Sequence, residues 1–312
     1  AEIIGNEDPS EMLFDEVIIR MNPTFELNTE GVFWYDLGEF QLLDRYGEII
    51  HGRASGSKKF ALANSLLTGW KADMQFNIGL SALFQQPILE RRTSIMDGQA
   101  KLIFTIDSED KYPTKVQTYI TGLRARNSPS LRKKYSFFSK LNKTENDGYM
   151  VYSEFLAGSK ENPSSDVQIT AQAMPRDKAN PFKFTLSAPK VSQSDIDFLS
   201  SALKPQEGFL RDNSSGQNTK TLKQKSKIPF WAKLHGEAII KLDEFILASG
   251  NTINGISALA TISDPSSSIK QIDASIKSSA LSGKAKVSYN FQNTSTYQIS
   301  STLTFNNIDP SI

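Results

Sequence analysis

The chain contains no cysteine, only two histidines and almost no net charge. Its 312 residues carry 35 Lys and Arg against 34 Asp and Glu, for a formal net charge of +1. The lack of cysteine excludes disulfide scaffolds, thiolate metal sites and cysteine nucleophiles. We expect His51 and His235 to be structural, since two histidines leave little room for imidazole metal sites. A charge near zero argues against a nucleic-acid partner, whose binding rests on basic excess. We expect no cofactor.

Long hydrophobic runs are also missing. Mean hydropathy is −0.36, and no apolar stretch approaches the roughly 20 residues that a transmembrane helix needs. The start at Ala1 has neither the basic nor the apolar region of a signal peptide. The last residue, Ile312, falls within a recurring strand pattern, so we expect the chain to be part of a longer protein.

The pattern that is present is alternation of apolar and polar residues. Such alternation places one set of side chains on each face of a strand, and it is typical of antiparallel sheet. We therefore predict a mainly β fold: an antiparallel, strongly twisted sheet, curled into a groove or a sandwich, with a few short helices. The clearest alternating segments are 100–106, 167–173, 256–262, 285–291 and 297–305.

Helical signals are few. A short helix is expected near 79–86, and another over 128–141, where Ser128 and Pro129 suit the cap and first position. A third is expected from Ser192 to Leu203, because Ile196, Leu199 and Leu203 are helically spaced.

The composition divides the chain into three parts. Residues 1–205 are a β-rich N-terminal part with short helices. Residues 206–228 are rich in amides, Ser and Lys, and predict a flexible polar linker or loop. Residues 229–312 form a repeating β segment, which we expect to be truncated at its C-terminal end.

The order of the repeating phrases is more specific than any one of them. A strand over 182–188 leads into Asp195-Ile196-Asp197, strands follow over 234–243, 253–262 and 281–287, and a strand over 297–305 leads into Ile308-Asp309-Pro310. This order resembles the C-terminal part of AsmA-like proteins of the Gram-negative envelope. The resemblance covers 182–203 and 234–312 well, and the first 180 residues only loosely.

The resemblance implies a location and a role. AsmA-like proteins are anchored in the inner membrane by an N-terminal helix, which this chain does not contain, and extend into the periplasm as a twisted β-groove that carries phospholipid without covalent chemistry. We therefore expect a non-enzymatic, periplasmic lipid-binding or lipid-transport protein that contributes to outer-membrane biogenesis. Its partners would be phospholipid or another acyl lipid, and other envelope proteins. The expected groove-lining residues are Ala238, Ile240, Leu242, Ile256, Ala258, Ala260, Val287, Tyr289, Phe291, Ile299, Leu303 and Phe305.

The same residues allow other interpretations. An apolar sheet face is equally suited to the packed core of a sandwich. A surface β-sandwich that binds glycan or protein would use exposed aromatics such as Trp34 and Trp70; the alternative is that these tryptophans are anchors of the core. A hydrolase built on Asp195 and Asp197 is the weakest alternative, because two nearby carboxylates at a helix start more often serve the helix dipole.

A basic segment is the sharpest local charge feature. Aromatic residues follow it, which would suit contact with anionic lipid headgroups. The alternative is a solvated helix face whose aromatics dock on the sheet. The basic residues are Arg124, Arg126, Arg132, Lys133 and Lys134.

Overall fold

A computed structural model describes most of the chain and is dominated by strands. Among the described residues 73% are in strands and 8% in helices, so the predicted mainly β, mostly antiparallel, twisted sheet with a few short helices is confirmed. The described residues are 17–59, 69–90, 93–144, 148–174, 181–204, 235–262, 269–278, 281–290 and 297–305.

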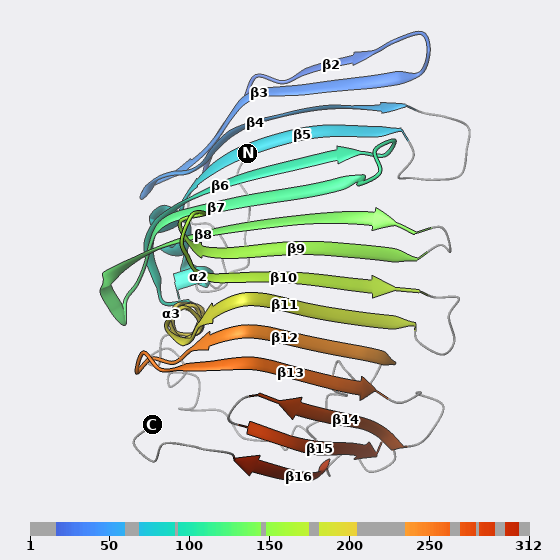
Figure 1. The fold of residues 1–312 in the computed structure, drawn as a ribbon. Helices are drawn as coiled ribbons and strands as arrows, with labels where there is room; N and C mark the ends of the chain where they lie inside the picture. The colour runs from blue at the N-terminus through green and yellow to red at the C-terminus, as the bar shows by residue number, and fades with distance from the viewer. Residues whose placement is uncertain are drawn as a thin grey trace, which may run out of the picture. The chain divides into compact units, whose positions relative to one another are not determined.

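The strands follow each other in the sheet almost in chain order (Figure 1). The order is β1-β3-β4-β5-β6-β7-β8-β9-β10-β11-β12-β13-β14-β15-β16, and β2 pairs with β3. Their bounds are β1 Ile18–Arg20, β2 Thr24–Leu27, β3 Val32–Asp44, β4 Gly47–Lys59, β5 Trp70–Gly79, β6 Ile95–Asp107, β7 Thr114–Ala125, β8 Ser128–Lys143, β9 Tyr149–Gly158, β10 Pro163–Ala173, β11 Phe182–Ser192, β12 Gly236–Ile246, β13 Thr252–Ile262, β14 Ile269–Lys277, β15 Leu281–Asn290 and β16 Tyr297–Phe305; the helices are α1 Leu80–Phe84, α2 Pro87–Glu90 and α3 Gln193–Leu203.

The chain forms two compact units with interleaved segments. Unit 1 contains residues 1–142, 155–162 and 195–213, and unit 2 contains 143–154, 163–194 and 214–312. The linker expected over 206–228 lies outside the described residues.

One strand pair departs from the predicted antiparallel arrangement. Strand β11 runs parallel to β12, with Phe184 opposite Ala238 and Leu186 opposite Ile240. A parallel pair needs a long crossover connection rather than a hairpin, and here α3 and the residues after it supply that length. The following pairs, from β12 to β16, are antiparallel.

Two of the three expected helices form, and one does not. Helix α1 occupies Leu80–Phe84 and α3 occupies Gln193–Leu203, as predicted. The helix expected over 128–141 is wrong, because this segment is strand β8. Its second half alternates along the strand, and pairing with β7 outweighs the local helix-start signal of Ser128 and Pro129.

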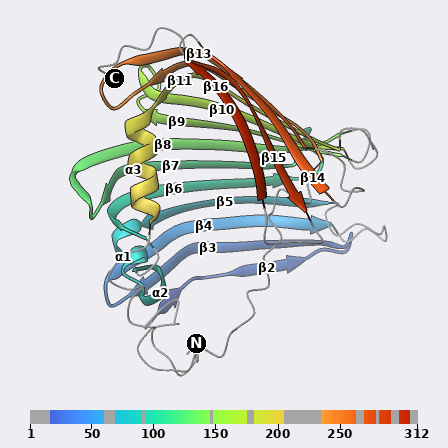
Figure 2. The same cartoon turned by 90° about the horizontal axis from the view of Figure 1, so that it is seen from below.

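The main buried core of unit 1 lies where α1 and α3 pack on one face of the sheet. Leu80 from α1 and Phe198 from α3 are 6% and 3% exposed, and they join Ala100 and Tyr135 from the strands. Figure 2 shows both helices at the same end of these strands. The helices therefore cover the strand ends of this face rather than its full length.

Candidate functional site

Strand register sorts the residues of unit 2 onto two chemically different faces. Ala238, Ile240 and Leu242 of β12 lie opposite Ala260, Ala258 and Ile256 of β13. Directly opposed residues of neighbouring strands point to the same side of a sheet. The six residues predicted here as groove lining therefore share one face, which we call the apolar face.

The apolar face continues across the remaining strands of the unit. One row runs from Ile262 through Ile272 and Val287 to Ile299. A second row, in the same pairs, runs from Ala260 through Ala274, Ala285 and Ser301, and a third runs from Ala258 through Ile276, Gly283 and Leu303. The strand positions of Tyr289, Leu303 and Phe305 also fall on this face, whereas Phe291 lies outside the described residues.

Most of these side chains are neither buried nor fully exposed. Ala238, Ile240, Ala258 and Val287 are half-buried. The range extends from Ile262, 8% exposed, to Ile299, 71% exposed. A sealed sandwich core would bury such a row, so the described residues leave the apolar face partly open to solvent.

The apolar face also extends to β10 and β11, which the sequence did not predict. Phe184 and Leu186 lie opposite Ala238 and Ile240 through the parallel pair, and they in turn oppose Ala171 and Ile169. The alternation in these strands predicted one apolar and one polar face for each. The parallel register, which joins them to the predicted lining, has no signal in the sequence.

The opposite face of unit 2 is polar and contains a hollow of about 440 Å³. Asp273 lies directly opposite Lys286, and Lys284 opposite Thr302. The hollow does not lie on the apolar face, because its lining is dominated by residues of the polar rows. The lining residues are Leu259, Thr261, Asp273, Ser275, Lys284, Ala285, Lys286, Ser300, Ser301 and Thr302.

Unit 1 shows the same separation of faces. Met74 and Phe76 of β5 lie opposite Phe104 and Leu102 of β6, and all four are half-buried. Gly52 of β4 opposes Phe76, where a Cβ would lie 2.6 Å from the ring and 2.1 Å from a backbone oxygen. The apolar side of unit 1 is thus lined along the strands and covered by α1 and α3 only near their ends.

The residues predicted as a weak hydrolytic pair have separate environments. The Asp195 side chain is 2% exposed, and its carboxylate accepts a hydrogen bond from Lys133 Nζ at 2.8 Å. Asp197 is exposed. Burial, with a smaller contribution from Asp195, raises the pKa of the Tyr135 hydroxyl well above its usual value. The arrangement is a buried ion pair that fixes α3 to β8, with one carboxylate rather than two.

The predicted basic segment divides into paired and exposed side chains. Arg124 pairs with Asp97, Arg126 with Glu90, and Lys133 with Asp195. The hydrogen bond from the Arg124 guanidinium lowers the pKa of Asp97. Arg132 and Lys134 are exposed. All five residues lie on β7, β8 and the turn that joins them, instead of on the expected helix.

Aromatic residues line a further hollow, of about 710 Å³, in unit 1. Trp34 is 51% exposed, and Asp36, Ser55 and Asp73 line the hollow beside it. Trp70, the second predicted platform residue, is half-buried with Lys58 Nζ 5.2 Å from its ring centroid. Trp34 lies opposite Ser57 and Trp70 opposite Lys58, the next residue of β4, so the two tryptophans point to opposite faces of the sheet and do not form one platform.

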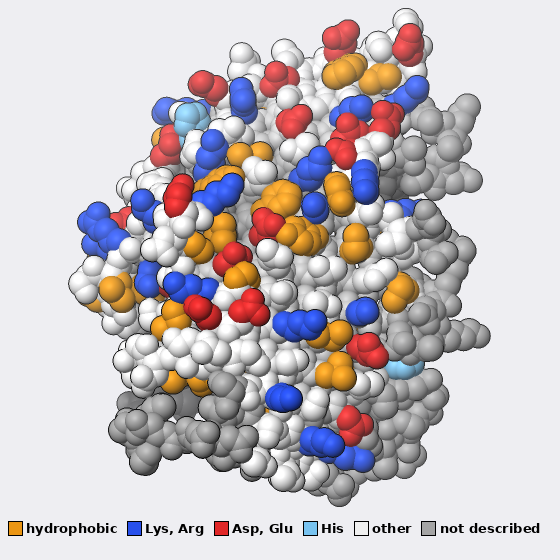
Figure 3. All heavy atoms as spheres, in the orientation of Figure 1, with side chains coloured by type: hydrophobic (Ala, Val, Ile, Leu, Met, Phe, Trp, Pro, Cys, Tyr) orange, Lys and Arg blue, Asp and Glu red, His pale blue; other side chains and the backbone are white. Residues whose placement is uncertain are grey.

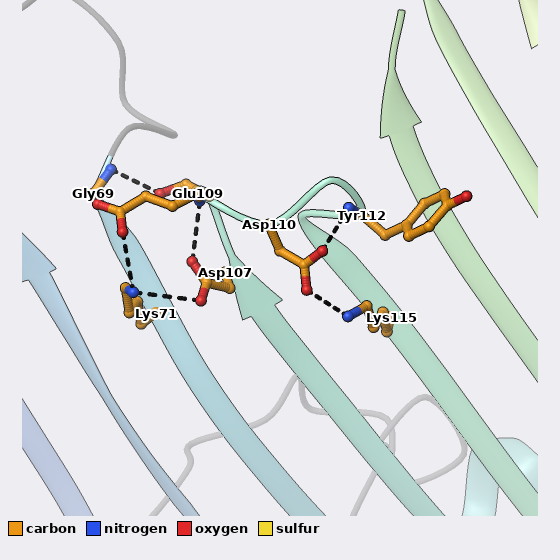
Figure 4. A network of polar contacts seen from close by, with 8 residues as sticks. Gly69, Lys71, Asp107, Glu109, Asp110, Tyr112 and Lys115 are labelled. Carbon is orange, nitrogen blue, oxygen red and sulfur yellow. Dashed lines mark hydrogen bonds and ion pairs between the residues drawn. The ribbon is translucent and has the colours of Figure 1, made fainter.

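The acidic turn between β6 and β7 is held by lysines (Figure 4). Lys71 Nζ lies 3.1 Å from a Glu109 oxygen and 3.4 Å from an Asp107 oxygen, while Lys115 pairs with Asp110. Hydrogen bonds to Glu109 and then Asp107 raise the pKa of Lys71. These carboxylates serve the turn, and the described residues contain no group of three or more His, Cys, Asp or Glu placed to hold a metal ion.

His51 and His235 lie apart from these features. His51 is on β4, 3.9 Å from a Glu48 carboxylate oxygen, and His235 precedes β12. No helix among the described residues is long and apolar enough to cross a membrane.

Comparison with known proteins adds no family to this description. No protein-family model, no curated protein and no solved structure matches the chain.

Proposed function

We propose that the protein binds acyl lipid along its apolar face, as a non-enzymatic envelope protein of the periplasm. The observation that carries the proposal is the aligned, half-exposed apolar face of unit 2, where rows of Ile, Val and Ala cross β12 to β16 in register. Exposed apolar area of this extent is typical of a binding surface. The resemblance to AsmA-like proteins supports the choice of phospholipid and of inner-membrane tethering.

The chemistry of the face suits a chain of methylene groups. Burial of each CH₂ contributes about 0.8 kcal/mol, and it needs no fixed donor or acceptor. The rows through Ala258 and Ala260 contain small residues, including Gly283 and Ser301. An acyl chain can approach the sheet closely along such rows, between the larger Ile and Val side chains.

A passive mechanism follows from the division of faces. Acyl chains lie on the apolar face while the charged headgroup remains in water at its margin, because burying a charge costs far more than the apolar contact returns. Movement along the rows, from one strand to the next, exchanges one set of similar apolar contacts for another. The protein contributes to phospholipid transport or outer-membrane biogenesis in this proposal.

Neighbouring residues on opposite faces provide the test. Ala258→Glu places a charge on the apolar face, whereas Ser257→Glu places it on the polar face of the same strand. Native mass spectrometry of the purified 312-residue protein should show bound phospholipid for the wild type and for Ser257→Glu. Ala258→Glu should lose at least about ten-fold in occupancy, as expected for a buried unpaired charge.

Two results would contradict the proposal. One is wild-type protein that neither retains phospholipid nor takes it up from added vesicles. The other is equal lipid occupancy in Ala258→Glu and Ser257→Glu, since binding would then not involve the apolar face.

The exposed ring of Trp34 supports a second candidate, glycan binding at the 710 Å³ hollow of unit 1. A half-exposed aromatic ring beside carboxylates and hydroxyls offers both stacking and hydrogen bonds to a sugar. Binding on a glycan array that disappears in Trp34→Ala and persists in Trp70→Ala would favour this candidate. Absence of any glycan bound by the wild type would dismiss it.

A further inference from the structure

Strand β8 bulges out of the sheet close to its turn with β7. Leu123 pairs with Lys133 and Ala125 pairs with Ser128, so a single β7 residue, Arg124, faces residues 129–132 of β8. Figures 1 and 2 show this part of β8 projecting past the ends of the neighbouring strands. We call residues 129–132 the β8 bulge. Bulges of this kind redirect side chains away from the sheet.

The β8 bulge is anchored on both sides. The backbone N–H of Arg126, in the turn before it, donates to the Ser94 carbonyl oxygen at 2.8 Å. Lys133, directly after it, donates to the buried Asp195 carboxylate at 2.8 Å. Hydrogen bonds therefore fix the residues on both sides of the β8 bulge to other elements of unit 1.

Its side chains combine exposed apolar and basic groups. Leu131 is 48% exposed, and Pro129, Arg132 and Lys134 are exposed as well. Figure 3 shows Lys and Arg side chains gathered at the end of the strands from which the bulge projects, on the left of the view. An exposed leucine next to exposed basic side chains is the composition of a membrane-surface contact.

The local charge balance leaves a positive excess at the projection. Residues 124–134 contain five basic and no acidic side chains. Three of the basic groups pair with carboxylates from other elements, namely Asp97, Glu90 and Asp195. Arg132 lies close enough to Asp97 to contribute to its lowered pKa, but Arg124 makes the direct contact. Arg132 and Lys134 are thus exposed to solvent, and the three carboxylates named above form their ion pairs with the other basic groups.

We propose that the β8 bulge docks the protein on a bilayer surface that carries anionic phospholipid headgroups. Leu131 enters the headgroup boundary, while Arg132 and Lys134 contact lipid phosphates. The choice of lipid as partner rests on the proposed function, but the surface differs: the bulge meets the membrane, and the apolar face holds individual acyl chains.

Vesicle flotation of the full 312-residue protein tests the docking. One set of vesicles contains phosphatidylcholine alone, and the other contains equal parts of phosphatidylcholine and phosphatidylglycerol. The wild type should float with the anionic vesicles, weakly or not at all with the neutral ones, and less in high salt. The double variant Arg132→Ser/Lys134→Ser should bind the anionic vesicles about 30-fold more weakly, and Leu131→Ser about ten-fold more weakly.

A matched control separates the bulge from overall charge. Arg53→Ser/Lys111→Ser removes two exposed positive charges elsewhere in unit 1 and should float like the wild type. Equal loss in both double variants, or equal binding of the wild type to both vesicle types, overturns the proposal. Thermal melting checks that each variant is folded, which is expected because the substituted side chains are exposed.

The same variants distinguish failure of docking from failure of the proposed function. Bound phospholipid, measured by native mass spectrometry, should be unchanged in Arg132→Ser/Lys134→Ser. Retained lipid with no flotation of the wild type refutes the docking and leaves the apolar-face proposal standing. Flotation that depends on the bulge, in a protein that never holds lipid, supports the docking and refutes the proposed function.

Discussion

At the scale of single residues, burial decides what a carboxylate does. Asp195 and Asp197 are two positions apart, yet one side chain is 2% exposed and paired with Lys133 while the other is exposed. The sequence marks both as residues that suit a helix start. It contains no sign of Lys133 as a partner, because that contact depends on β8 being a strand beside α3.

The Lys133–Asp195 pair should contribute strongly to stability. Asp195→Ala leaves the Lys133 ammonium without its partner in a largely buried site, and we expect the free energy of unfolding to fall by about 3 kcal/mol. The neighbouring Asp197→Ala should change it by less than about 0.5 kcal/mol. Urea denaturation of the full chain measures both. Equal effects of the two substitutions would refute the structural role assigned to Asp195.

A second residue-scale prediction concerns pH. Burial, and then the charge of Glu154, raise the pKa of Asp166. Glu154 also accepts a hydrogen bond from the Tyr152 hydroxyl, which raises the pKa of Tyr152 to about 12. A carboxyl with a raised pKa in the folded state contributes stability that is full below its unfolded pKa and is lost as pH rises through the folded value. Asp166→Asn should therefore increase the melting temperature at pH 7 by a few degrees and have little effect near pH 3. A melting temperature at pH 7 that falls would contradict this assignment.

At the scale of elements, local signals failed where pairing dominates. Ser128 and Pro129 suit a helix start, but Tyr135, Phe137 and Leu141 lie an even number of positions apart, on one face of a strand, and pair along β7. The adjacent helix α3 was predicted correctly, although two of the residues that indicated it, Ile196 and Leu203, are exposed. The residues of α3 that pack in the core of unit 1 are Phe198 and Ala202, four positions apart. The parallel β11–β12 pair could not be predicted, since the polar stretch after α3 has the composition of a boundary between two parts of the chain and gives no sign that the strands before and after it pair.

Helix α3 should be held mainly by its buried face. Phe198 is 3% exposed, with its ring centroid 6.4 Å from that of Tyr135, whereas Leu203 on the same helix is 62% exposed. Phe198→Ala should lower the free energy of unfolding by about 3 kcal/mol or more through loss of apolar burial and creation of a cavity. Leu203→Ala should cost less than about 1 kcal/mol. Urea denaturation measures the free energy of unfolding of both variants, and equal losses in the two would contradict the prediction.

At the scale of the whole molecule, alternation predicted which residues share a face but not how far that face extends. Hairpins fix the register of β12 to β16, so a period-2 pattern was enough to group Ala258, Val287 and Ile299. The extension to β11 depends on a parallel register set by a distant crossover. The degree of exposure depends on what packs against the sheet, and single-strand patterns contain no information on that.

The last strand of the described sheet lacks the usual protection of an edge. Among the described strands β16 has β15 as its neighbour and none on its other side. Its nine residues include no charge, proline or glycine, and their pairing with β15 is uninterrupted. Natural edge strands carry such interruptions because a free ladder of N–H and C=O groups pairs with other chains. We therefore expect this edge to associate with a second copy of itself.

The sequence of β16 favours antiparallel self-pairing about Ser301. In that register Ile299 faces Leu303 of the second copy, and Ser300 faces Thr302, so like positions meet. Thr302→Lys places two ammonium groups on the same face as diagonal neighbours across the pair, and their repulsion should weaken self-association by about ten-fold. Ser257→Lys, on β13 within the sheet, should not. Sedimentation velocity over a concentration series measures both variants against the wild type, and a wild type that stays monomeric throughout, or equal weakening by the two lysines, would show that β16 is not the associating edge.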